Sequence, residues 1–412
     1  MNRLVKTAAV LLGSILLAAH AAANDGWNQW RGPQRDGRSP GEAWPSSFDS
    51  MKTSWRVPLG KGYPGPVVAE KTVFVVETVD TKTVAVRALD RASGEERWRQ
   101  SWPGKGKVPF FAASNGDWVR STPGYDGERL YVGDMQEVLR ALDAATGEVL
   151  WEVDFPATFE TGVPDFGFAS SPMVDGNALF VQAANSLVKL DTETGETVWR
   201  ALQGSGNIAA SGAFSSPVIA TVAGERQLIV LSRHTLYGVN PETGAELWSH
   251  DVPNFRGMNI LTPVVYGDSI FTSPYKGRSY LYSLQKKDGT FEISESWTNK
   301  ATAYMSSPVV IGDHLYMHLG NGRIDCIDLR TGESRWRSNA FGKYQSMVFR
   351  DDKILALDET GWLYLFRASP VGFELLDSRQ VSEQPSWGHL AVSGDQLFVR
   401  ELEGVIALDW RE

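Results

Sequence analysis

A short segment that recurs along this chain constrains its fold more than any other feature. Its clearest copy runs from Leu142 to Trp151 and consists of an apolar residue, Asp, several polar residues, Gly, Glu and a final Trp. Asp can open a turn by hydrogen-bonding its own backbone, and Gly supplies the positive φ that closes it. We therefore predict a strand, a tight turn and a return strand on which the Trp packs.

The segment recurs often enough to predict a closed ring. Further copies end at Trp98, Trp199, Trp248 and Trp336, and altered copies end at Trp297 and Asp377. Trp55 lacks the preceding turn, whereas the fragment 407–409 lacks the following strand. Spacings of roughly 40 to 50 residues suit a four-stranded propeller blade. We expect an all-β, eight-bladed propeller of antiparallel blades, closed by pairing N- and C-terminal strands so that no sheet edge stays open.

A second repeated marker, Ser-Ser-Pro or a close variant, precedes the first strand of most intervals, as at Ser170–Pro172. Pro is tolerated at the start of a strand. We expect a single propeller domain over residues 55–412 and an N-terminal strap over residues 24–54. The segment from Trp27 to Gly37 allows two interpretations. Trp30 could stack on a ligand while Arg31 or Arg35 binds an anion, or the segment could pack against the ring, which we favour.

The first residues are typical of a secretory signal peptide. Arg3 and Lys6 precede an apolar stretch, and Ala21 to Ala23 form a small-residue cleavage site, so residues 1–23 are predicted to be removed. We expect a periplasmic or secreted chain without a membrane span. The single cysteine, Cys326, lies far from this junction, so we expect no lipid anchor there. Its place on a repeat strand favours a buried structural thiol.

The chain is acidic, with 49 Asp and Glu against 40 Lys and Arg and a formal net charge of −9. Such a balance argues against nucleic acid or anionic lipid as a partner. We expect a monomeric propeller with an envelope protein as its partner.

The repeated turn, the Ser-Ser-Pro marker and the Trp30–Pro33 segment together resemble the PQQ-like β-propeller repeat proteins. That superfamily includes quinoprotein alcohol dehydrogenases and the outer-membrane assembly factor BamB, and the resemblance covers most of residues 55–412. It implies that the repeat tryptophans dock one blade on the next, and their even spacing agrees. These residues are Trp98, Trp151, Trp199, Trp248, Trp297 and Trp336.

The resemblance also raises the question of cofactor chemistry. A quinoprotein dehydrogenase needs calcium, a catalytic Asp and a slot for the quinone, and many carry a disulfide between adjacent cysteines. A single cysteine excludes that disulfide, and no Cys-x-x-Cys-His haem motif is present. We therefore assign no catalytic residue, no metal site and no cofactor, with PQQ and calcium kept as the alternative.

The loops that join each outer strand to the next Ser-Ser-Pro should converge around the axis, where function usually resides. They contain large aromatic, Arg and Met residues, which suit a recognition surface. The same side chains could instead simply plug the funnel. The candidate ligand- or partner-binding residues are Trp118, Arg120, Phe168, Asn207, Arg256, Asn259, Tyr304, Tyr344, Trp387 and His389.

From these features we expect a non-catalytic, exported binding or scaffold module, with a BamB-like role in outer-membrane protein assembly. Two alternatives stay open. One is a PQQ- and calcium-dependent quinoprotein dehydrogenase that uses the central funnel. The other is a carbohydrate-binding propeller whose aromatic loops provide stacking platforms.

Overall fold

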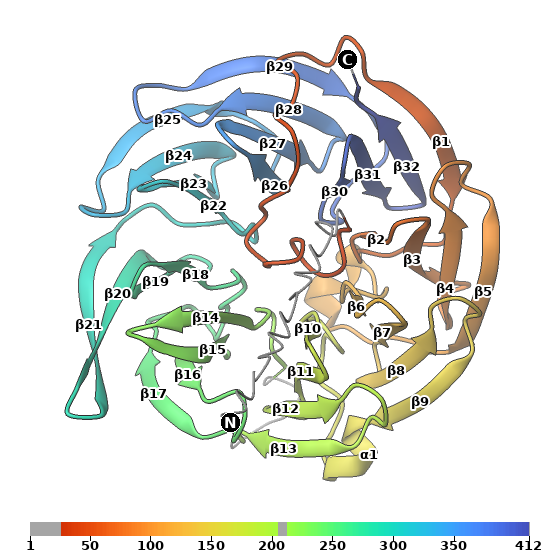
Figure 1. Cartoon of the computed structure of the whole chain (residues 1–412), viewed down its shortest axis with the longest axis horizontal. Coiled ribbons are helices and arrows are strands. Elements are labelled where there is room, and N and C mark those ends of the chain that lie inside the picture. The colour runs from red at the N-terminus through yellow and green to blue at the C-terminus, as the bar shows by residue number, and fades with distance from the viewer. Residues whose placement is uncertain (1–25, 205–211, 412) are drawn as a thin grey trace, which may run out of the picture.

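The computed structural model describes residues 26–204 and 212–411, so the predicted signal peptide and Asn207 lie outside the described residues. Its strands form eight antiparallel sheets of four strands, arranged as blades around one axis (Figure 1). The predicted eight-bladed propeller is confirmed. Within the described ranges, no helix is both long and apolar enough to cross a membrane.

In each blade the strands follow one another from the axis to the rim. Blades 1 to 4 consist of β2 (Val67–Val68), β3 (Thr72–Val79), β4 (Thr83–Asp90) and β5 (Glu96–Pro103); β6 (Gly124–Tyr125), β7 (Arg129–Gly133), β8 (Val138–Asp143) and β9 (Val149–Asp154); β10 (Met173–Asp175), β11 (Ala178–Ala183), β12 (Ser186–Asp191) and β13 (Thr197–Ala201); and β14 (Val218–Val222), β15 (Glu225–Leu231), β16 (Thr235–Val239) and β17 (Glu246–Asp251). Two short helices, η1 (Phe110–Asn115) and α1 (Phe155–Phe159), lie in the connections after blades 1 and 2.

The other half of the ring repeats this order. Blades 5 to 8 consist of β18 (Val264–Tyr266), β19 (Ser269–Thr272), β20 (Ser279–Lys287) and β21 (Thr290–Asn299); β22 (Val309–Ile311), β23 (His314–His318), β24 (Arg323–Asp328) and β25 (Ser334–Ala340); β26 (Gln345–Arg350), β27 (Lys353–Asp358), β28 (Trp362–Arg367) and β29 (Glu374–Gln380); and β30 (Ala391–Ser393), β31 (Gln396–Glu401), β32 (Gly404–Asp409) and β1 (Lys52–Pro58). Blade 8 thus joins both ends of the chain, because β1 pairs with β32 and Trp55 lies opposite Ala407.

The middle strands form the core because neighbouring blades cover both of their faces. Six consecutive residues of β4 are buried, and Leu130 and Val132 of the next blade pack in the same cluster. Outer strands such as β9 instead alternate between half-buried and exposed residues. Apolar runs in the middle strands and alternation at the rim are what this two-sided burial requires.

The repeat turn has the predicted geometry. Asp143 Oδ1 accepts hydrogen bonds from the backbone N–H groups of Ala145 at 2.9 Å and Thr146 at 2.8 Å. The N–H of Gly147, whose φ is 79°, donates to the carbonyl of Asp143. An added Cβ on Gly147 would lie 2.5 Å from the indole of Trp98 in the preceding blade. Glycine is therefore required both by the backbone conformation and by the close approach of the ring.

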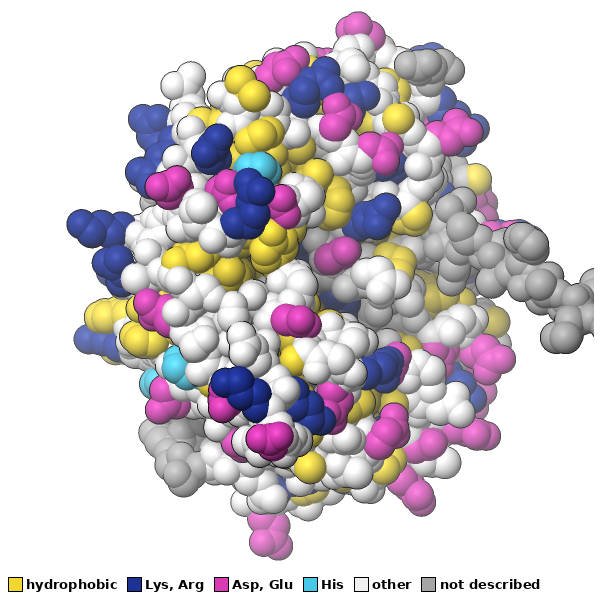
Figure 2. All heavy atoms as spheres, turned by 60° about the vertical axis from the view of Figure 1, so that its left-hand side comes forward, with side chains coloured by type: hydrophobic (Ala, Val, Ile, Leu, Met, Phe, Trp, Pro, Cys, Tyr) yellow, Lys and Arg dark blue, Asp and Glu magenta, His cyan; other side chains and the backbone are white. Residues whose placement is uncertain are grey.

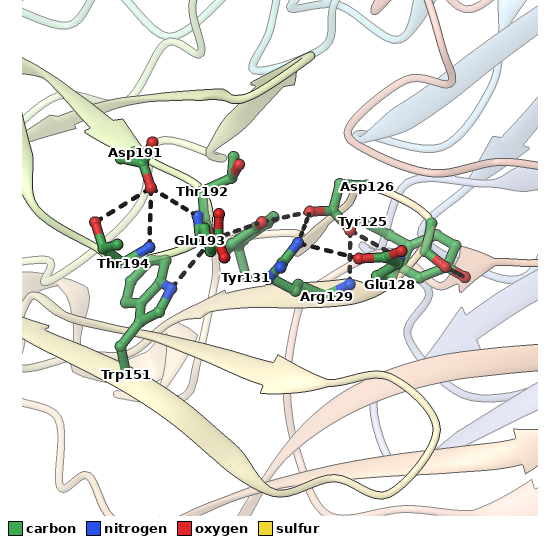
Figure 3. A network of polar contacts seen from close by, with 11 residues as sticks. Tyr125, Asp126, Glu128, Arg129, Tyr131, Trp151, Asp191, Thr192, Glu193 and Thr194 are labelled. Atoms are coloured by element: carbon green, nitrogen blue, oxygen red, sulfur yellow. Dashed lines mark hydrogen bonds and ion pairs between the residues drawn. The ribbon is translucent and has the colours of Figure 1, made fainter.

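The same indoles tie most of the blades to the next. Trp151 Nε1 of blade 2 donates to the carbonyl of Thr192 in blade 3 at 3.1 Å (Figure 3). Corresponding bonds start from Trp55, Trp98, Trp199, Trp297 and Trp336. Trp248 differs, because its Nε1 donates to Gln227 Oε1 within its own blade at 2.6 Å. The following blade has a long β20–β21 hairpin at this level instead of the Asp–Gly turn.

Candidate recognition surface around the axis

The two faces of the ring are built from different connections. Because the strands of a blade alternate in direction, the turns joining first to second and third to fourth strands share one face. The turns joining second to third strands share the other face with the loops that lead into the next blade. We call the face with the first-to-second and third-to-fourth turns the strap face. We call the face with the second-to-third turns and the loops between blades the funnel face.

The strap, residues 26–50, crosses the axis in Figure 1. Backbone bridges join Trp27 to Val68 in blade 1 and Arg38 to Phe349 in blade 7, the two blades that flank blade 8 (Figure 1). Trp30 Nε1 donates to Thr262 Oγ1 at 3.0 Å. These contacts link blades 1, 5 and 7 through one segment.

Two buried arginines complete this attachment. Arg35 donates to the carbonyls of Pro172 at 2.8 Å and Ser171 at 3.0 Å, and Arg31 donates to the carbonyl of Pro308. Burial lowers the pKa of Arg35 to about 9, with a further contribution from the charge of Arg31. Both guanidinium groups are bonded to carbonyls of Ser-Ser-Pro segments. These hydrogen bonds attach the strap to the ring.

On the funnel face, five aromatic rings follow one another around the axis. Tyr63 stacks on Trp387 with ring centroids 5.1 Å apart, and Trp387 lies 4.3 Å from Tyr344. Tyr344 lies 5.3 Å from Tyr304, which lies 5.6 Å from Tyr275. We call these five residues the aromatic arc. All of them are half-buried, so one part of each side chain meets solvent.

Cations line and extend this arc. Lys343 Nζ lies 5.5 Å from the ring centroids of both Tyr304 and Tyr344, and Lys276 Nζ lies 5.4 Å from that of Tyr275. Arg120 lies over Tyr63 at 5.5 Å, and burial lowers its pKa. A cation over an aromatic face is attracted by the ring quadrupole.

The same alternation continues around the rest of the funnel face. Phe166 lies between Arg120, at 5.8 Å, and Phe214, at 5.3 Å. Phe255 contacts both Arg256 and Lys276. Rings and cations therefore follow one another around the axis, with contributions from blades that are distant in sequence.

The structure separates the predicted candidates into two groups. Trp118, Arg120, Arg256, Tyr304, Tyr344 and Trp387 are at least partly exposed on the funnel face. Phe168 and Asn259 are each only 1% exposed, so they do not reach the surface, which corrects their placement. Phe168 packs on Phe155 in the core, and Asn259 Nδ2 donates to the carbonyl of Arg233.

His389 is also buried, and it is enclosed by strap residues. Its ring centroid lies 4.9 Å from that of Trp30 and 6.4 Å from that of Trp27. Burial lowers its pKa to about 3, and the charge of Arg31 acts in the same direction. The imidazole is therefore neutral at neutral pH and belongs to the core between strap and funnel.

Some residues of the arc escaped the sequence analysis. Tyr275 and its neighbour Lys276 come from the turn between β19 and β20, whereas the predicted residues all belong to loops that lead into the next blade. Tyr63 lies in the short loop before β2, where Gly65–Pro66 replaces Ser-Ser-Pro. The alternation of strand direction places both kinds of connection on one face, and that signal could have identified them.

A cavity of about 360 Å³ lies between blades 3 and 4. Glu137, Gln182, Arg233 and His234 are among its lining residues. Glu137 Oε2 accepts a hydrogen bond from the N–H of Ala184 at 3.0 Å. Burial nevertheless raises the pKa of Glu137 to about 8.

The described residues do not fit a calcium–quinone centre. In residues 26–204 and 212–411, no group of three or more His, Cys, Asp or Glu side chains could hold a metal ion. Calcium requires several oxygen ligands, commonly carboxylates. The axis is occupied instead by the strap, with Trp30, Arg31 and His389 packed together.

Residues 82–338 match the family model described as outer membrane protein assembly factor BamB. BamB of Shewanella oneidensis is 25% identical over 323 residues, which cover 72% of this chain and 76% of that protein. Polyvinylalcohol dehydrogenase of a Sphingopyxis strain is 29% identical, but the match covers 43% of this chain and 28% of the enzyme.

Solved structures with the same fold include both kinds of protein. BamB from Moraxella catarrhalis has a TM-score of 0.62 at 14% identity, covering 88% of this chain and 98% of that one. Quinohemoprotein alcohol dehydrogenase from Comamonas testosteroni has a TM-score of 0.55 at 13% identity, covering 95% and 81%. Identities this low show the propeller fold alone. The family match over more than half of the sequence carries the assignment, and the chain belongs to the outer membrane protein assembly factor BamB family of PQQ-like β-propellers.

Proposed function

We propose that this protein is an exported, non-catalytic docking module that takes part in outer-membrane protein assembly. The aromatic arc is the surface that contacts an envelope protein partner. The observation that carries this proposal is the row of partly exposed Tyr and Trp rings with cations beside them.

The composition of the arc suits a protein interface. Aromatic residues and Arg dominate binding energy at interfaces, and aromatic rings bury a large area with few rotatable bonds. The rings already contact one another, so little side-chain freedom remains to be lost on binding. Lys343 and Lys276 beside the arc favour an acidic partner surface.

The test is photo-crosslinking in the organism that carries the gene. A photoreactive amino acid replaces Tyr344 in the full chain, and crosslinked proteins are identified by mass spectrometry. We expect crosslinks to the outer-membrane assembly machinery. We also expect deletion of the gene to lower outer-membrane protein levels. Normal levels together with no crosslink at this position would contradict the proposal.

A charge reversal tests the same contact without disturbing the core. Lys343 is exposed, so Lys343→Glu should weaken partner capture about tenfold while thermal stability stays unchanged. Lys71→Glu is the matched control, because Lys71 is an exposed lysine in a turn of the strap face. Equal capture by both variants would remove the arc from the interface.

A further inference from the structure

The most exposed aromatic side chains of the protein lie in one short turn on the funnel face. Phe110 is 91% and Phe111 72% exposed, and their rings form an edge-to-face pair with centroids 5.8 Å apart. Both belong to η1, in the loop between β5 and β6. Exposing two adjacent phenylalanines to water is unfavourable unless another surface covers them.

The turn that carries this pair is firmly held. Ala112 is buried, and its N–H donates to the carbonyl of Pro109 at 2.8 Å. The N–H of Gly116 donates to the carbonyl of Ala113, while the Tyr63 hydroxyl donates to the carbonyl of Asn115. The two rings are thus presented by a structured turn and would lose little freedom on binding.

Two lysines share the loop of this apolar tip, and a third lies beside Trp118. Lys105 and Lys107 are exposed in the same loop, and Lys61 Nζ lies 5.1 Å from the ring of Trp118. The nearest acidic residue in the loop is Asp117, beyond the turn. Along the loop, two exposed lysines therefore precede the apolar tip, and a half-buried tryptophan follows it.

Charge is also divided between the two faces. The loops and second-to-third turns of the funnel face carry similar numbers of basic and acidic residues: Lys61, Lys82, Lys105, Lys107, Arg120, Arg233, Arg256, Lys276, Arg278, Lys300 and Lys343 against Asp80, Asp117, Asp134, Glu137, Glu160, Asp165, Glu359, Glu383 and Glu403. The turns of the strap face carry Lys71, Arg91 and Arg330 against Glu70, Glu95, Asp126, Glu128, Glu148, Glu193, Glu196, Glu242, Asp268, Asp288, Asp313, Glu333, Asp351, Asp352 and Asp395. In Figure 2, basic side chains stand along the left-hand edge and acidic ones gather at the lower right.

We propose that the Phe110–Phe111 turn is a lipid-contacting tip, which inserts into a bilayer surface of anionic phospholipid while Lys105 and Lys107 bind the headgroups. This contact goes beyond the protein-docking role of the aromatic arc and does not depend on it. The overall acidity of the chain argued against such a surface, but the turns of the strap face carry a large excess of acidic over basic residues.

A lipid surface matches the tip better than a protein does. An anionic leaflet presents negative charge above an apolar interior, which is the order of Lys and Phe in this loop. Aromatic rings such as Trp118 favour the interface between the two layers. A protein groove would have to enclose both rings on several sides, whereas a leaflet accepts them without a matching shape.

The experiment measures binding of the purified chain, residues 24–412, to vesicles by co-sedimentation. The vesicles contain phosphatidylcholine and phosphatidylglycerol at about 7:3, with pure phosphatidylcholine for comparison. We expect binding to the anionic vesicles that weakens with salt. The double variant Phe110→Ser/Phe111→Ser should bind at least about tenfold more weakly, and Lys105→Glu/Lys107→Glu likewise about tenfold.

Val371→Ser is the matched control, because Val371 is 92% exposed in the turn between β28 and β29 on the strap face. It should bind vesicles like the unchanged chain. All of these side chains are exposed, so thermal unfolding should stay unchanged in every variant and confirm that the fold is intact.

A site-specific probe locates the contact. Cys326 is buried, and burial raises the pKa of its thiol to about 12, so a cysteine introduced at exposed Ala113 can be labelled selectively. An environment-sensitive dye at Ala113→Cys should shift to the blue on adding anionic vesicles, whereas the same dye at Ala92→Cys on the strap face should not.

Two results would overturn the lipid contact. The first is no binding to anionic vesicles, or equal binding by the Phe110→Ser/Phe111→Ser variant. The second is a loss of partner capture in that variant with vesicle binding unchanged, which would assign the tip to a protein. Capture experiments in the absence of lipid, with Lys343→Glu, report separately on the aromatic arc.

Discussion

At the scale of single residues, the glycine of each repeat turn meets two separate requirements. Gly195 has a φ of 73°, and an added Cβ would lie 2.7 Å from the Trp151 indole of the preceding blade. Gly176 has a φ of 58° but nothing within 4 Å of the same position. The pair therefore separates backbone strain from the packing of one blade on another.

We predict that Gly195→Ala destabilises the protein more than Gly176→Ala does. A left-handed conformation costs about 1–2 kcal/mol for either alanine. Displacing the indole adds about 1–3 kcal/mol at position 195 alone. Thermal unfolding of both variants measures the difference. Equal losses would mean that the indole moves aside freely and does not dock the blades. By the same reasoning, Trp199→Ala should cost about 3–5 kcal/mol.

Glu137 gives a second prediction, on pH. Burial raises its pKa to about 8 from an ordinary 4.5, so the folded protein keeps a proton that the unfolded chain releases. Its contribution to stability is therefore full below about pH 4.5 and is lost as pH rises through 8. Glu137→Gln keeps an oxygen acceptor for the Ala184 N–H without titrating. The variant should match the unchanged protein near pH 4.5 and become the more stable of the two at higher pH.

Melting temperatures from pH 4.5 to 9 test this prediction, and Glu148→Gln, which alters an exposed carboxyl group, is the control. Parallel curves for the unchanged protein and Glu137→Gln would show that the carboxyl group titrates alike in the folded and unfolded states. The position of Glu137 in a turn between strands gave no sign of burial in the sequence. The neighbouring blade, which covers it, supplies the low-polarity environment.

At the scale of elements, the strap converts a ring of blades into a filled propeller. Its own backbone forms few regular bonds with the sheets, so side chains make most of the attachment. For the Trp27–Gly37 segment, sequence reasoning favoured packing against the ring, but no sequence feature decided between packing and ligand binding. It could not show that the arginines reach the Ser-Ser-Pro carbonyls, since those acceptors lie more than a hundred residues away.

Arg35 allows a direct test of this attachment. Arg35→Met keeps much of the apolar stem but leaves the carbonyls of Ser171 and Pro172 without their donors. Buried acceptors that lose a charged partner should cost about 2–4 kcal/mol. Arg38→Met is the control in the same strap, because Arg38 is exposed. We expect a lower melting temperature and faster proteolysis of the strap for Arg35→Met. Identical behaviour of the two variants would show that the strap is held mainly by its tryptophans.

At the scale of the whole molecule, the sequence repeats made the ring of blades predictable, whereas they did not make the aromatic arc predictable. Eight markers at a similar spacing imply eight blades, and two incomplete ends imply a shared blade. The aromatic arc combines residues from several connections, none of which repeats, so the spacing of markers carries no information about it. A departure from the repeat can likewise reflect a contact that does not repeat. Asp377 takes the Trp position opposite Leu365, and its carboxylate accepts a hydrogen bond from the N–H of Phe48 in the strap.

Closure of the ring gives the last prediction. β32 lies between β31 and β1, so a chain that ends at Leu402 loses the strand that joins the two termini. Trp410 would be lost as well, and with it the hydrogen bond from its Nε1 to the carbonyl of Ser47 in the strap. Because exposed strand edges pair with other chains, we expect this truncated protein to unfold without a sharp transition and to aggregate on size exclusion. A chain that ends at Trp410 keeps every strand and should behave like the full one. A monomeric, cooperatively melting product of the longer truncation would show that seven blades and the strap suffice, and that pairing of the termini does not hold the ring together.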